Sequence, residues 1–178
     1  QKVMGALFRR AQDIYTIAHD MTNGMGPLRT GSASDPIRCA ILISGSGSGM
    51  QAMVTHQQTH LDCGHRTVLV ISDNPEATGL MKAEQLGIQA HCIALPEEAD
   101  RTLRRHLHEQ QILSLIQEHQ IELILLSGYM RLVSADFVDH WTPRIINIHP
   151  SLLPAFPGAH AHRDVLAAGV EVSGCTVH

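Results

Sequence analysis

Two polar side chains, Asn147 and His149, have the types and spacing for chemistry at a carbonyl carbon. They follow a short apolar run, Ile145-Ile146, that indicates the end of a strand, and they precede a turn rich in proline. Residues two apart on an extended segment point to the same side, so both side chains would face one pocket. There the amide could donate to an oxyanion and the imidazole could give or take a proton. The alternative is a strand-end turn that carries an incidental histidine.

A glycine-rich turn follows the first apolar run. Residues 38–44 are typical of a buried parallel strand, and Gly45-Ser46-Gly47-Ser48-Gly49 comes directly after them, before a helical pattern begins at Met50. This order aims backbone N–H groups and the positive end of a helix at an anion. A dinucleotide fingerprint needs Gly where Met50 stands, and a P-loop needs a following Lys, so the turn predicts a phosphate monoester site. The alternative is a turn without a ligand.

The sequence from residue 38 onward alternates strand and helix patterns. After the first strand we expect strands at 67–72, 88–93, 121–126, 144–147 and 171–178, and helices at 77–86, 99–119, 134–140 and 163–168. This alternation predicts an α/β fold with an open, mostly parallel, Rossmann-like sheet, helices on both faces and the 121–126 strand at its centre. Ligands of such sheets bind beyond the carboxyl ends of the strands. The segments 45–49, 128–133 and 147–149 all lie at such ends, which favours one site at one rim.

The ends of the sequence predict its domain organisation. Leu7, Ala11, Ile14 and Ile17 are spaced for one face of an amphipathic helix over residues 1–20, and residues 22–36 have the composition of a linker. We therefore expect an N-terminal extension and linker over 1–36 and a single domain over 37–178. The chain does not start with Met and stops within a predicted strand, so we expect a piece of a longer reading frame whose domain is incomplete at its C-terminus.

Composition argues against several classes of protein. The 178 residues carry a net charge of −4 and only 3% aromatic residues, which disfavours nucleic acid as a partner. No apolar run approaches the roughly 18 residues of a membrane helix. The four cysteines form no C-x-x-C pair, so we expect reduced thiols and a cytoplasmic protein. The 13 histidines include His56 and His60 at helical spacing, but they lie among polar residues typical of a solvated face, and we predict no metal.

Four motifs resemble glycinamide ribonucleotide (GAR) formyltransferase, and the similarity covers about residues 38–178. They are Ser-Gly-Ser-Gly-Ser from Ser44, Ser-Gly-Tyr-Met-Arg from Ser127, Asn-Ile-His-Pro-Ser-Leu-Leu-Pro from Asn147 and Pro-Gly-Ala-His-Ala-His from Pro157. The resemblance implies transfer of a formyl group from 10-formyltetrahydrofolate, as cosubstrate, to the amine of GAR in purine (IMP) biosynthesis. No metal is implied.

The resemblance also implies a role for particular residues. The positions that match the family's phosphate-binding residues are Gly47, Ser48 and Gly49. The positions that match its folate-binding residues are Arg105, Met130, Arg131, Leu132, Val133 and Asn147. Asn147 further matches the residue at the transferring formyl group, and His149 matches the catalytic acid.

Two departures from the family pattern matter. Gly49 stands where the family usually has Asn. The family also places an essential Asp a short way beyond the position of His178, so we expect the chain as given to be inactive alone. A formyltetrahydrofolate hydrolase and a non-catalytic folate- or nucleotide-binding module remain as alternatives. The resemblance is compatible with a homodimer or with a fusion to another purine-pathway domain.

Overall fold

The structure, a computed structural model, describes residues 26–178. The helix expected over residues 1–20, and the first part of the expected linker, lie outside the described residues. Within the described residues, no helix is long and apolar enough to cross a membrane.

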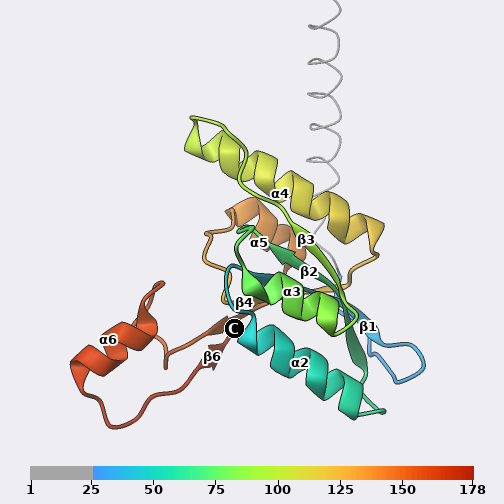
Figure 1. The fold of residues 1–178 in the computed structure, drawn as a ribbon, viewed down its shortest axis with the longest axis horizontal. Helices are drawn as coiled ribbons and strands as arrows, with labels where there is room; N and C mark the ends of the chain where they lie inside the picture. The colour runs from blue at the N-terminus through green and yellow to red at the C-terminus, as the bar shows by residue number, and fades with distance from the viewer. Residues whose placement is uncertain (1–25) are drawn as a thin grey trace, which may run out of the picture.

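Six strands form one sheet in the order β3-β2-β1-β4-β5-β6 (Figure 1). Their bounds are β1 (Ile37–Ile43), β2 (His65–Ser72), β3 (Gln89–Cys92), β4 (Leu123–Ser127), β5 (Ile145–His149) and β6 (Thr176–Val177). The first five pair in parallel, and β6 pairs antiparallel to β5. The expected α/β class and the central place of β4 are therefore confirmed.

Within residues 26–178, five helices connect these strands, and α2 to α5 cover the two faces of the sheet. They are α2 (Ser48–Thr59), α3 (Thr78–Gln85), α4 (Arg101–Glu118), α5 (Ala135–Trp141) and α6 (Ala161–Ala168). One core cluster joins α4 and α5 to the sheet through Ile112, Ile116 and Phe137. A second cluster joins α2 and α3 to the other face through Met50, Val54 and Ala83. The central strand β1 contributes alternate side chains to both clusters, as its apolar run from Cys39 to Ile43 requires.

Local sequence explains where several helices begin and end. Asp100 and Ser134 cap α4 and α5, because their side chains accept the backbone N–H of Leu103 and Phe137. Gly87 follows α3 with φ 76°, a left-handed conformation that favours glycine. These ends agree with the expected helices to within two or three residues.

Two of the differences from the expected strands affect the part of the sheet that carries Asn147 and His149. The strand expected over 144–147 runs to His149, because pairing with β6 continues the ladder past Asn147. The last strand, expected over 171–178, is only Thr176–Val177, since residues 172–175 make no ladder contact. In Figure 1, α6 and the segment leading to β6 project away from the three-layered body.

Residues 26–36 have no regular structure but are attached to the sheet. Arg29 bonds the carboxylate of Glu122, just before β4, at 2.5 and 2.8 Å. Arg144, just before β5, donates to the carbonyl oxygens of Gly26 (2.8 Å) and Pro27 (3.1 Å). This part of the expected linker therefore lies against the amino ends of the strands.

Candidate active site

Three of the segments singled out by the sequence meet at the carboxyl ends of the strands. Ser44, just after β1, donates its backbone N–H to the carbonyl of Gly128 (3.1 Å), and its hydroxyl accepts the N–H of Met130 (2.8 Å). Because β4 lies between β1 and β5, the 128–133 turn lies between the glycine turn and the pair Asn147 and His149. These three segments are called the rim below.

The glycine turn presents free backbone donors. Gly47 caps α2 in the left-handed region, with φ 63° and no side-chain hydrogen bond, and the first helical bond runs from the N–H of Gln51 to its carbonyl (2.8 Å). The amides of the first helical turn have no partner within the helix. No acidic residue occupies that turn. The N-terminal end of α2 is thus suited to bind an anion such as a phosphate.

Contacts with α3 hold this turn in place. The N–H of Gly79 donates to the carbonyl of Gly45 (3.0 Å), and the ammonium group of Lys82 donates to that of Ser46 (2.9 Å). A Cβ at Gly79 would lie 2.4 Å from the Ile43 side chain and 2.9 Å from the Gly45 oxygen. Only glycine permits this approach of the turn to the helix.

The structure also gives a steric context for Gly49, the departure from the family pattern. A Cβ at Gly49 would lie 2.4 Å from the hydroxyl oxygen of Ser127, at the end of β4. Any larger residue, including Asn, would require that hydroxyl to move. Glycine at 49 and serine at 127 therefore fit together.

Asn147 and His149 lie on β5 itself, so their side chains share one side of the strand. Asn147 exchanges both backbone hydrogen bonds with His178 of the neighbouring segment, at 2.7 and 3.0 Å. Its side-chain amide donates to Nε2 of His178 (2.9 Å). An amide nitrogen carries two hydrogens, so one donor of Asn147 is left for a ligand.

A carbonyl oxygen fixes the imidazole of His149. Nε2 lies 3.0 Å from the oxygen of Phe156, and since a carbonyl only accepts, Nε2 carries the hydrogen. The ring nitrogen left for proton transfer is Nδ1, which makes no hydrogen bond within residues 26–178. The same oxygen accepts from the buried hydroxyl of Ser151 (3.0 Å), which also donates to the Ala155 carbonyl (2.7 Å).

Ser151 and Phe156 were missed by sequence reasoning. A serine directly after His-Pro, at the start of a proline-rich turn, is a known turn-forming residue and could have indicated the first of them. Phe156 has φ 53°, which nothing in its residue type predicts. Its contribution is a main-chain oxygen, and such a role leaves no mark on the sequence.

The 128–133 turn exposes apolar side chains at the rim. Met130 is 59% exposed and Leu132 83% exposed, whereas Val133 packs against the core. Nε of Arg131 lies 2.5 Å from the buried carboxylate of Asp73, at the end of β2. Burial, and then the charge of Asp73, raise the pKa of Tyr129.

Arg105, also predicted to bind folate, lies on α4 and not on one of the three rim segments. It is exposed on the second turn of α4, and its guanidinium makes no hydrogen bond or ion pair within residues 26–178. The structure therefore leaves this cation available without bonding it to the rim. In the part of the chain that the structure describes, no group of three or more potential ligands could hold a metal ion.

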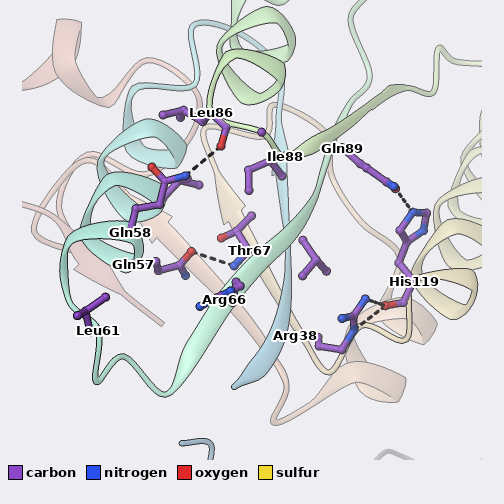
Figure 2. A pocket seen from close by; sticks show the side chains of 13 residues that line it. Arg38, Gln57, Gln58, Leu61, Arg66, Thr67, Leu86, Ile88, Gln89 and His119 are labelled. Carbon is purple, nitrogen blue, oxygen red and sulfur yellow. Dashed lines mark hydrogen bonds between the residues drawn. The ribbon is translucent and has the colours of Figure 1, made fainter. Parts of the chain in front are cut away.

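A cavity of about 560 Å³ lies at the opposite end of the sheet (Figure 2). It is lined by residues at the start of β1, β2 and β3, including Arg38, Thr67 and Gln89, and by none of the predicted site residues. Its polar groups bond one another: Gln57 accepts the N–H of Thr67 (2.8 Å), and Arg38 bonds the carbonyl of His119. We assign the chemistry to the rim, because parallel α/β sheets bind ligands at the carboxyl ends of their strands.

The fold is an open α/β sheet whose predicted site residues gather beyond the carboxyl ends of its strands, and sequence comparison identifies the family. The family described as formyl transferase matches residues 37–178. The chain belongs to the formyl transferase family.

Individual relatives show which members of this family the chain is similar to. The chain is 38% identical over 139 residues to the phosphoribosylglycinamide formyltransferase of Escherichia coli (strain K12), covering 78% of this chain and 63% of that protein. It is 40% identical over 145 residues to the trifunctional purine biosynthetic protein adenosine-3 of Gallus gallus, covering 82% of this chain and 14% of that protein. The crystal structure of phosphoribosylglycinamide formyltransferase from Brucella melitensis matches with 42% identity and a TM-score of 0.72, covering 81% of this chain and 72% of that one. The chain therefore spans only part of each of these relatives.

Proposed function

We propose that the protein containing this domain transfers a formyl group from 10-formyltetrahydrofolate to the amine of GAR in purine biosynthesis. The observation that carries the proposal is the pair of hydrogen bonds by which Ser44 joins the glycine turn to the 128–133 turn. The apolar 128–133 turn thereby lies between the phosphate-type turn and the Asn147 and His149 pair. The relatives named phosphoribosylglycinamide formyltransferase support the formyl transfer and its acceptor.

The glycine turn is proposed to hold the phosphate of GAR. The donors would be the backbone amides of Ser48 and Gly49 and the Ser48 hydroxyl, with Gly47 as the residue that lets the chain turn. Absence of acidic side chains from this helical turn favours the bound anion. Because Gly49 has no Asn side chain to donate a hydrogen bond, the backbone amides are proposed to bind the phosphate in its place.

The folate is proposed to lie on the 128–133 turn. Met130 and Leu132 offer exposed apolar surface for a fused ring, and the backbone from Arg131 to Val133 offers hydrogen bonds to it. Arg105, with an unpaired guanidinium, is proposed to hold a carboxylate of the folate.

The reaction is proposed to proceed by direct attack. The GAR amine forms a bond to the formyl carbon, and the oxyanion that develops accepts hydrogen bonds from the Asn147 amide and the protonated His149. The bond from that carbon to the folate nitrogen then breaks, and His149 assists proton transfer to the departing nitrogen. Since Nε2 is held by Phe156, the proton moves at Nδ1.

The test uses the full-length protein and follows release of the folate product with and without GAR. GAR-dependent release that is lost in His149→Ala, but kept in the control His106→Ala on the exposed face of α4, supports the proposal. Asn147→Ala should lower kcat by about 10²–10³, as loss of one oxyanion donor does. Release without GAR would identify a hydrolase, and no release would leave a binding module; either result overturns the proposal.

A further inference from the structure

Two buried carboxylates contact the ends of the segment 131–134, and nothing in the proposed reaction uses them. Asp73 and Glu109 are each 6% exposed. Burial of a carboxylate is costly unless its oxygens accept hydrogen bonds, and both Glu109 oxygens and Oδ2 of Asp73 accept theirs from this segment. Here both hold the turn that the proposed function assigns to folate.

Glu109, on α4, binds the C-terminal end of this segment with both of its oxygens. Oε1 accepts the backbone N–H of Ser134 (2.6 Å), and Oε2 accepts its hydroxyl hydrogen (2.7 Å). The Ser134 hydroxyl in turn accepts the N–H of Phe137 at the start of α5. One carboxylate therefore links α4, the rim turn and α5.

The same part of α4 is attached to the sheet. Nε2 of His108, which is 3% exposed, donates to the carbonyl of Ile93 just after β3 (2.8 Å). Arg105 lies four residues before Glu109, so the two share one face of the helix. The contacts of His108 and Glu109 fix the position of the helix that carries Arg105 relative to the turn.

Asp73 binds the other end of the segment. Its Oδ2 lies 2.5 Å from Nε of Arg131, and this carboxylate follows the last residue of β2. The Arg131 side chain is 49% exposed, whereas the Asp73 side chain is 3% exposed. The buried aspartate is therefore the more constrained partner, and the ion pair holds the exposed turn against the end of β2.

We propose that Asp73 and Glu109 are positioning residues that hold the 131–134 segment in the conformation that binds the folate cosubstrate. The inference rests on the proposed function. A turn with strongly exposed side chains would otherwise sample many conformations, and binding would have to select one of them. Two charge-assisted anchors remove that cost before the ligand arrives.

The test measures steady-state kinetics of the full-length protein with Glu109→Gln and Asp73→Asn. Glutamine keeps one acceptor and turns a donor toward one of the two Ser134 donors, and asparagine removes the charge that Arg131 faces. Each change should raise the KM for 10-formyltetrahydrofolate about tenfold, because a charge-assisted hydrogen bond that orders the turn before binding is weakened or lost. The kcat at saturation and the KM for GAR should change less than about twofold, because the reacting groups are untouched.

Matched controls are Glu118→Gln, an exposed carboxylate on the same helix, and Asp139→Asn, an exposed one on α5. A purely structural role predicts a lower thermal midpoint with equal losses for both substrates, and would refute the inference. A second readout does not need turnover: amide hydrogen exchange at residues 130–134 should quicken in both variants. If the unmodified protein transfers no formyl group, the proposed function fails. If it transfers the group but the variants keep their folate KM and their slow exchange, the positioning role fails.

Discussion

Ser151→Ala tests the contact network that fixes His149. The serine is fully buried, and its hydroxyl bridges the carbonyl oxygens of Ala155 (2.7 Å) and Phe156 (3.0 Å). Phe156 keeps the His149 donor when the hydroxyl is removed, and the exposed Ala155 can turn to water. The loss is therefore that of a net hydrogen bond, about 1–1.5 kcal/mol, rather than the full cost of a buried orphan.

The assay is urea unfolding of the chain. With a slope of about 2 kcal/mol/M, a loss of this size lowers the midpoint by roughly 0.5–0.8 M. The matched control is Ser114→Ala, whose hydroxyl donates to the Gln110 carbonyl (3.0 Å) on an exposed part of α4. It should change stability by less than about 0.5 kcal/mol, as surface substitutions do.

A second measurement links this network to the imidazole. Nitrogen chemical shifts should show His149 with its hydrogen on Nε2, because the Phe156 oxygen only accepts. In Ser151→Ala the bond can loosen, and the fraction of that tautomer should fall. Equal stability losses at positions 151 and 114, or a His149 with its hydrogen on Nδ1, would refute the reasoning.

Two further predictions concern the amino ends of the strands and the glycine turn. The hydrogen bond from Arg29 holds the pKa of the Glu122 carboxyl below its ordinary value, so the pair stabilises the fold above about pH 4.3 and this contribution is lost as pH falls through the lower folded pKa. Glu122→Gln should flatten the acid side of a stability–pH profile, and an unchanged acid side would contradict the ion pair. Gly79→Ala should cost about 1–3 kcal/mol through overpacking and raise the KM for GAR in the full-length protein, because the added carbon meets the Gly45 oxygen. Normal stability and KM in that variant would show that the turn adapts.

Strand and helix patterns predicted most of the fold, since burial imposes period and composition on each element. The continuous apolar run of β1 and the caps at Asp100 and Ser134 are local signals that survive folding unchanged. The strand through Asn147 and His149 was predicted too short, because its last residues are held by β6, about 30 positions away in sequence. Periodicity carries no information about such a distant partner.

The candidate site was predictable only as far as its side chains form motifs. Asn147 and His149 were recognisable by type and spacing, but Asp73 and Glu109 look like ordinary charged residues until their burial is known. The atom that fixes His149 is a main-chain oxygen, and it became visible only with the fold.

Residues 26–36 are attached to the end of the sheet that lies opposite the rim. Arg144 donates to the carbonyl oxygens of Gly26 and Pro27 at the amino ends of the strands, whereas the rim lies at the carboxyl ends of the same strands. This described part of the predicted linker therefore lies at the amino ends of the strands and leaves the rim uncovered. A ligand could therefore reach the rim without displacing residues 26–36.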